Sequence, residues 1–91
     1  MSKESRLVKL ITEETLKFKG VGKTKPSVKI SEEDDEYIIN LDILVDYGVN
    51  IPQLSYDIQT GLIHSLMEHE GIVVKTVNIT VEGIYEEQRT K

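Results

Sequence analysis

Residues 37–47 read YIINLDILVDY, and this stretch decides the fold class. Apolar side chains occupy every second position, and most positions between them are polar. A period of two places successive side chains on opposite faces of a β-strand. The stretch therefore predicts a long strand with one buried face and one mostly polar face. Its alternating apolar positions are Tyr37, Ile39, Leu41, Ile43, Val45 and Tyr47.

Two elements are predicted upstream of this strand. Residues 27–32 alternate around Val28 and Ile30, which indicates a short strand. The acidic residues 32–36 are typical of a solvated turn, so the two strands form an antiparallel hairpin. Residues 5–18 carry apolar side chains at helical spacing, with Ser2 or Ser5 as the expected N-cap. A loop containing Gly20, Gly22 and Pro26 follows that helix.

A helix and a last strand are predicted downstream. Residues 51–69 repeat Leu or Ile at every fourth position, which predicts a helix with one buried stripe. Asn50 is suited to cap it, Pro52 suits its first turn, and Gly71 ends it. Residues 72–84 alternate again and predict the final strand, while residues 86–91 are expected to fray.

The order of elements is therefore α-β-β-α-β. The middle strand, the second helix and the last strand form a βαβ unit, in which the two strands run parallel. The predicted fold is α+β, a three-stranded mixed sheet covered on one face by two helices. A chain of 91 residues is expected to form one domain over residues 1–91.

Composition excludes several classes of protein. The chain has no Cys, which removes disulfides, thiolate metal sites and cysteine nucleophiles. No window is apolar enough to span a bilayer, and the first residues lack the apolar core of a secretory signal. These features favour the cytoplasm. The net charge of -5 makes nucleic acid an unexpected main partner.

The charge is divided unevenly along the chain. Residues 1–29 carry eight basic and three acidic side chains, whereas residues 30–91 carry three basic and thirteen acidic ones. A basic first third on an acidic body suits an anionic surface, an acidic partner or a second copy. The alternative function is therefore a small binding module for an anionic ligand or nucleic acid. Its candidate contacts are Lys17, Lys19, Lys23, Lys25 and Lys29.

Motifs of catalysis and metal binding are weak. Gly22-Lys23-Thr24 resembles the end of a phosphate loop, but Lys17 stands where the first glycine belongs. His64 and His69 are five residues apart, so they point in different directions around a helix. The acidic run lacks the ligand spacing of a calcium loop. We expect no enzyme activity, no cofactor, no metal and no small-molecule substrate.

Two regions are candidate contact surfaces. Tyr56, Ile63 and Met67 form a second apolar stripe on the second predicted helix, which is either an interface or the edge of the core. The turn before that helix is the other candidate. Its contact residues are Tyr47, Asn50, Ile51 and Pro52.

Three motifs in order carry a resemblance to a known family. They are DYGVNIP at residues 46–52, Asp57-Ile58-Gln59, and VNITVEGI at residues 77–84. Together they resemble the alkaline shock proteins, the envelope stress response proteins of Gram-positive bacteria, over about residues 28–84. Members of that family usually begin with a strand before an Ala-rich first helix. We expect this chain to lack that strand, because few residues precede its first predicted helix, which is basic and free of Ala.

The resemblance implies a role without catalysis. The family comprises abundant cytoplasmic proteins that can self-associate and are linked to cell-envelope homeostasis. Some are held at the inner face of the membrane by a small anchor protein. The sequence therefore predicts a cytoplasmic interaction or scaffold protein of the envelope stress response. We expect self-association, a possible membrane anchor partner, and a peripheral place at the membrane through that partner.

Overall fold

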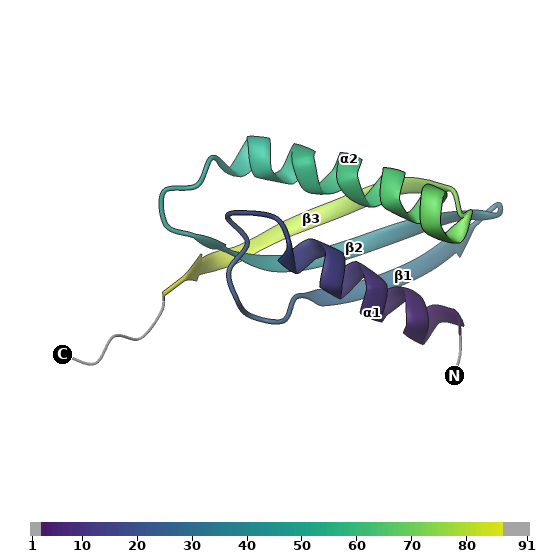
Figure 1. Ribbon diagram of the computed structural model, residues 1–91, viewed down its shortest axis with the longest axis horizontal. Helices are drawn as coiled ribbons and strands as arrows, with labels where there is room; N and C mark the ends of the chain where they lie inside the picture. The colour runs from purple at the N-terminus through teal and green to yellow at the C-terminus, as the bar shows by residue number, and fades with distance from the viewer. Residues whose placement is uncertain (1–2, 87–91) are drawn as a thin grey trace.

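A computed structural model describes residues 3–86, which form two helices and three strands (Figure 1). Their order is α-β-β-α-β, as the sequence predicts. The bounds are α1 Lys3–Leu16, β1 Ser27–Glu33, β2 Glu36–Asp46, α2 Ile51–Glu70 and β3 Val74–Tyr85. Residues 87–91, where most of the predicted frayed tail falls, lie outside the described part of the chain.

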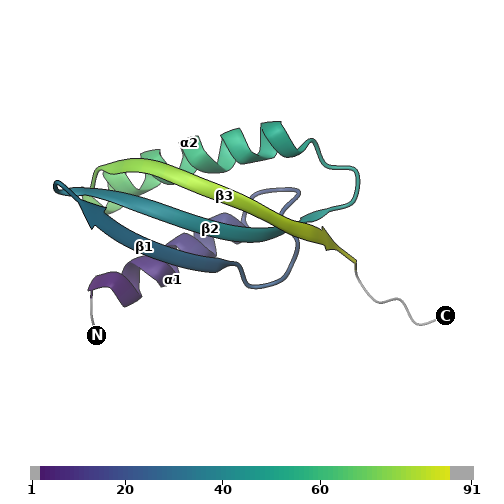
Figure 2. The same cartoon turned by 180° about the vertical axis from the view of Figure 1, so that it is seen from behind.

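The sheet has the order β1-β2-β3, with the long strand β2 in its centre. Strand β1 runs antiparallel to β2, and β3 runs parallel to β2. Ile39 of β2 lies opposite Ile30 on one side and Val77 on the other. Both helices cover the same face of this mixed sheet (Figures 1 and 2). The predicted α+β fold is confirmed.

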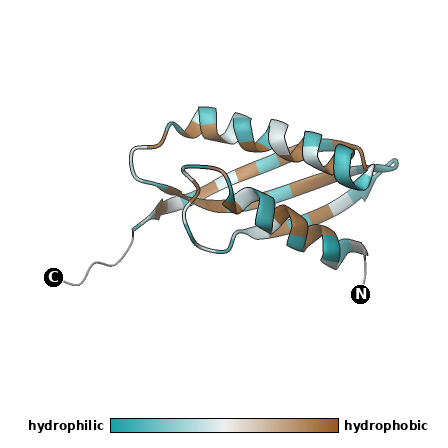
Figure 3. Ribbon diagram, viewed as in Figure 1, coloured by the Kyte–Doolittle hydropathy of each residue, from teal (hydrophilic) through white to brown (hydrophobic). Residues whose placement is uncertain are grey.

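The core lies between the sheet and the two helices. The alternation in β2 is confirmed, because its odd-numbered apolar side chains from Ile39 to Val45 are buried while Asn40 and Asp46 are exposed. Hydrophobic and hydrophilic stretches also alternate along both helices (Figure 3). The helices contribute Leu7, Ile11, Leu54, Ile58, Leu62 and Leu66 to the core. Burial of these side chains is the main source of stability for a domain of this size.

The hairpin turn is shorter than the sequence predicts. Pairing of β1 with β2 continues to Glu33 opposite Glu36, so only Asp34 and Asp35 remain between the strands. Both aspartates have positive φ angles, of 51° and 66°. A two-residue turn of this kind matches the twist of an antiparallel hairpin, and Asp tolerates the left-handed conformation.

The ends of α2 lie where the sequence predicts them, whereas those of α1 are shifted. In α2, the side chain of Asn50 accepts a hydrogen bond of 3.0 Å from Gln53 N–H, and Gly71 ends the helix with φ of 67°. Both predictions are confirmed. Helix α1 begins at Lys3 and ends at Leu16, two residues earlier at each end than predicted, so Ser5 lies inside the helix and is not its cap. Ser2 lies outside the described residues.

The loop after α1 extends the sheet. Upstream of the first residue of β1, Val21 forms an antiparallel bridge with Val45 of β2. Gly22 N–H donates to the carbonyl of Leu44, and Asp46 N–H donates to the carbonyl of Gly20, both at 2.8 Å. These bonds place Val21 in the core. The sequence predicts only an irregular loop here, because a single bridging residue leaves no periodic pattern.

Candidate functional site

The apolar stripe of α2 faces solvent. Tyr56, Ile63 and Met67 are 62%, 37% and 47% exposed, whereas the row of Leu54, Ile58, Leu62 and Leu66 on the same helix is buried against the sheet. The stripe and this row therefore lie on different sides of the helix. The structure thus places these three side chains at the surface, and a contact through them stays a prediction.

The turn between β2 and α2 is a second exposed region. The spacing of Tyr47 predicts a place on the buried face of the strand, but β2 ends at Asp46 and the side chain of Tyr47 is 86% exposed. A positive φ of 82° at Gly48 turns the chain away from the sheet and ends the alternation. Ile51 and Pro52 open α2 and are exposed as well. A hollow beside the turn is lined by Lys19, Gly20, Asp46, Tyr47, Gly48 and Val49.

The five lysines of the basic segment are spread over several places. Lys17 forms an ion pair with Glu14, and Lys19 lines the hollow beside Tyr47. Lys25 lines a different hollow along α1. Lys29 lies on the face of the sheet that the helices leave open, opposite Asn40 of β2. Lys23 is exposed in the loop. Anion binding by this segment stays a prediction.

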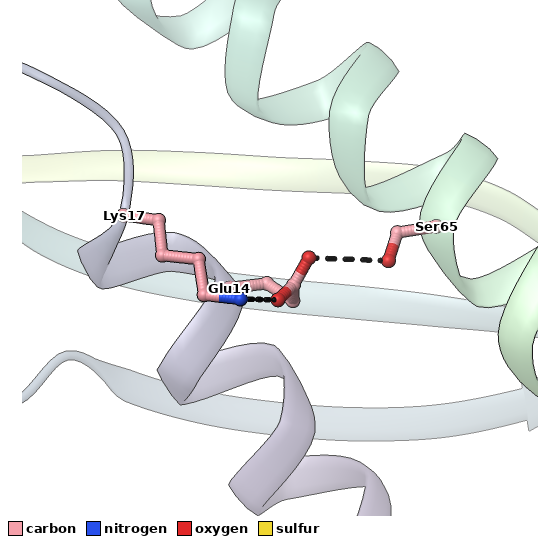
Figure 4. A network of polar contacts seen from close by, with 3 residues as sticks. All are labelled: Glu14, Lys17 and Ser65. Carbon is pink, nitrogen blue, oxygen red and sulfur yellow. Dashed lines mark hydrogen bonds and ion pairs between the residues drawn. The ribbon is translucent and has the colours of Figure 1, made fainter.

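A small polar network joins the two helices (Figure 4). Glu14 of α1 accepts a hydrogen bond of 2.7 Å from the ammonium of Lys17 and one of 3.2 Å from the hydroxyl of Ser65 on α2. An ion pair of 2.8 Å between Arg6 and Glu70 links the first turn of α1 to the C-terminal end of α2. The bond from Lys17 is the main reason that the pKa of the Glu14 carboxyl lies below its ordinary value.

The lowered pKa of Glu14 gives a pH-dependent contribution to stability. A carboxyl whose pKa falls on folding stabilises the folded state above its unfolded pKa and loses that effect as the pH falls through its folded pKa. We expect Glu14→Gln to lower the thermal midpoint slightly at pH 7, and to lower it less at an acidic pH below the folded pKa of Glu14, because the wild-type carboxyl has then lost its charge as well. Thermal unfolding at both pH values measures this. An equal deficit at both pH values would contradict the role of the charge.

The motifs of catalysis do not assemble into a site. His64 pairs with Glu68 on the exposed side of the same helix, at 2.7 Å. Among residues 3–86, no group of three or more His, Cys, Asp or Glu side chains is placed to hold a metal ion. The Gly22-Lys23-Thr24 stretch precedes a strand and not the helix N-terminus that a phosphate loop requires. Within residues 3–86, no helix combines the length and hydropathy needed to cross a bilayer.

One residue with a clear structural role was not identified as such from the sequence. Gln59 of α2 donates a hydrogen bond of 2.8 Å from its side-chain amide to the backbone carbonyl of Val77 in β3. Its neighbour Ile58 is fully buried. The Ile-Gln pair thus supplies one core contact and one link from helix to strand. In the sequence, Gln59 was part of the Asp57-Ile58-Gln59 motif and was a polar side chain next to the buried row, but neither feature indicated this bond.

These features define a class: a two-layer α+β domain in which, among the described residues, most of the large exposed apolar side chains lie on α2 and on the turn before it. Comparison with known proteins gives the family. The model of the alkaline shock protein 23 family, described by a cell envelope-related function, matches residues 4–86. The chain belongs to this family, and the resemblance seen in the sequence is confirmed.

The chain is also similar to curated proteins without an assigned function. It is 30% identical over 57 residues to the uncharacterized protein YloU of Bacillus subtilis, covering 63% of this chain and 48% of that protein. It is 31% identical over 61 residues to the uncharacterized protein Spy1535 of Streptococcus pyogenes serotype M6, covering 67% and 47%. The matched region thus spans about half the length of these relatives. No solved structure matches the chain significantly.

Proposed function

We propose that this chain is a non-catalytic interaction protein that acts in the cytoplasm in processes related to the cell envelope. The observation that carries the proposal is the exposed stripe of Tyr56, Ile63 and Met67 on α2. Large apolar side chains that gather on one surface are typical of protein contact sites. The family's cell envelope-related function supports the setting of this contact.

The partner we propose first is another copy of the chain. Burial of the stripe in a contact removes apolar surface from water, and each large side chain contributes on the order of 1–2 kcal/mol. The exposed Tyr47, four residues before the N-terminus of α2, adds an aromatic side chain. Tyr is enriched among the residues that contribute most to binding at protein interfaces. A membrane anchor protein is the second proposed partner, and it would hold the assembly at the inner face of the membrane.

Sedimentation velocity over a wide concentration range tests the proposal. We expect the wild type to gain mass with concentration, and the double variant Ile63→Glu/Met67→Glu to stay monomeric at the same concentrations. Charge placed in an apolar contact must be desolvated without a partner, which costs far more than the contact contributes. Both side chains are exposed in the monomer, so we expect the fold and its circular dichroism spectrum to be retained.

Leu16→Glu is the matched control. Leu16 is an apolar side chain at the end of α1, 41% exposed and therefore comparable with Met67. The control adds one negative charge, where the double variant adds two, at a similar exposure away from the stripe, and it should leave association unchanged. A wild type that remains monomeric over the whole range would overturn self-association. Equal loss of association in both variants would overturn the assignment to the stripe.

A further inference from the structure

Within residues 3–86, no strand pairs with the outer edge of β3, and the sheet shows which backbone groups of β3 point toward that edge. Tyr37 N–H donates to the carbonyl of Val73, so odd-numbered residues of β2 direct their backbone groups toward β3. In a parallel pair, such a residue bonds the two residues that flank its partner. Ile39 lies opposite Val77, so Thr76 and Asn78 bond β2. The N–H and carbonyl groups of the odd-numbered residues from Val77 to Val81 therefore point outward.

Gln59 closes one end of this edge. Its side-chain amide donates to the outward carbonyl of Val77 at 2.8 Å. Beyond that point, Ile79 and Val81 direct their backbone groups away from β2, and β3 is the last strand of the sheet within residues 3–86. An outer edge of this kind is a template for a further strand.

The two edges of the sheet differ in their suitability for strand pairing. Residues 76–81 of β3 read TVNITV, with no charge and no proline, and five of the six are β-branched. Edge strand β1 carries Lys29, Glu32 and Glu33 within seven residues and follows Pro26. Charges and proline on an edge oppose the addition of a strand, whereas β-branched residues favour it. The free segment of β3 is therefore the more suitable edge.

We propose that two copies of this chain pair antiparallel through the outer edge of β3 and form a continuous six-stranded sheet. This inference rests on the self-association proposed above and assigns it a surface. Ile79 of each copy lies opposite Val81 of the other, so that the outward backbone groups of both are paired. The twofold axis passes beside Thr80. This register leaves the Val77 carbonyl bonded to Gln59 in both copies.

The charges along β3 favour an antiparallel over a parallel second copy. Glu82 and Glu86 lie at the end of the strand and just beyond it, and Lys75 at its beginning is already paired with Glu33 of β1 at 2.8 Å. Antiparallel pairing keeps the acidic ends of the two strands apart, because Glu82 of each copy lies opposite Asn78 of the other. A parallel arrangement would place like charges side by side, which is unfavourable.

The stripe of α2 lies on the same side of the molecule as this edge. Gln59 is bonded to the edge, and it lies roughly 40° from Ile63 and 60° from Tyr56 around the helix axis. In the six-stranded sheet both copies of α2 cover the same face, with their exposed stripes turned toward the partner copy. Strand pairing and the exposed stripe therefore contribute to one continuous surface.

A cysteine at the proposed axis tests the pairing in a chain that has no Cys of its own. Thr80 is exposed and lies opposite Asp42, on the face of the sheet without helices, so Thr80→Cys leaves the core intact. Residues opposite each other in a non-hydrogen-bonded pair have Cα atoms about 4.5 Å apart, within the range of a disulfide. We expect oxidation to convert most of the Thr80→Cys variant to a disulfide-linked dimer on a non-reducing gel.

Two matched cysteine variants serve as controls. Ser31→Cys places the thiol on the same open face but on edge strand β1, and Asn78→Cys shifts it by two positions along β3. Both should remain largely uncrosslinked. Crosslinking of Ser31→Cys to the same extent would contradict the assignment to β3. More efficient crosslinking of Asn78→Cys than of Thr80→Cys would overturn the register centred on Thr80.

Association without oxidation is measured with Thr80→Lys and its control Ser31→Lys; a lysine at position 80 lies opposite Asp42 of its own chain and so adds no repulsion within one copy. Two lysines facing each other at the axis repel, so we expect the dissociation constant of Thr80→Lys to rise by roughly tenfold or more and that of Ser31→Lys to stay at the wild-type value. If the wild type associates but neither Thr80 variant differs from its control, the β3 interface is wrong while self-association stands. If the wild type does not associate at any concentration, both are wrong.

Discussion

Truncation of Ile58 to alanine is expected to destabilise the fold by about 3 kcal/mol, within the usual range of roughly 2–5 kcal/mol for such changes. Ile58 is fully buried in the middle of α2, against the sheet. Its truncation removes three carbon atoms from the core and leaves a cavity that the neighbouring side chains fill only in part. A domain of this size has a total stability on the order of 5–10 kcal/mol, so the loss is a large fraction of it.

Urea unfolding followed by circular dichroism measures this effect, with Ile63→Ala as the matched control. Ile63 carries the same side chain on the same helix but is 37% exposed, and we expect its truncation to cost less than about 1 kcal/mol. Similar midpoints for the two variants would show that α2 does not pack on the sheet through the row that contains Ile58.

Replacement of Gly22 by alanine is expected to cost roughly 1–3 kcal/mol. A Cβ atom at this position would lie 2.4 Å from the Cβ of Tyr85 and 3.3 Å from the Cβ of Leu44. Both neighbouring atoms are attached directly to the sheet backbone, so the contact is relieved only if strands or loop move. Gly22 also bonds β2 through its N–H, which fixes the loop in place. The expected readout is a lower midpoint of thermal unfolding.

Gly83→Ala is the control, because Gly83 lies on β3, the strand that contains Tyr85. A Cβ at Gly83 would have the end of the Leu44 side chain as its nearest neighbour, at 3.6 Å, which is an ordinary contact. We expect its stability to stay within about 0.5 kcal/mol of the wild type. If the Gly22 variant were as stable as the Gly83 variant, the close approach of the loop to Tyr85 would not exist in solution.

Gly22 also shows that a glycine in a short functional motif can be required by packing and not by a ligand. In the sequence it begins a Gly-Lys-Thr stretch that resembles part of a phosphate loop. In the structure it gives room for Tyr85, which is more than sixty positions away in the sequence. A glycine required by a distant neighbour and one required by a ligand look the same in one sequence. The spacing around Gly22 argued against a phosphate loop, but it did not predict the packing.

The sequence predicted which residues of the candidate contact surface lie together, but it did not predict that they are exposed. The spacing of Tyr56, Ile63 and Met67 placed them together on α2, since side chains on one helix face recur every three or four residues. Spacing alone did not decide between core and surface, because a helix can be apolar on a second side that also packs. That choice depends on how the helix is rotated over the sheet, which is a property of the assembled layers.

The free edge of β3 was not predictable from the sequence. Which strand lies at an edge depends on the order of strands in space, and whether the Val77 carbonyl is covered depends on the reach of Gln59 from another element. These are contacts between segments 18 residues apart in the chain. Local periodicity carries no information about them.

The sequence by itself determined the kind and order of the five elements, because the periods of 2 and 3.6 residues, the cap at Asn50 and the break at Gly71 are local features. It also determined which face of β2 is buried. Only the tertiary structure decided the two-residue hairpin turn, the bridge from Val21 to Val45, the exposure of Tyr47 and the free edge of β3. Each of these depends on which distant segment lies alongside, and that is set when the helices and the sheet bury their apolar faces together.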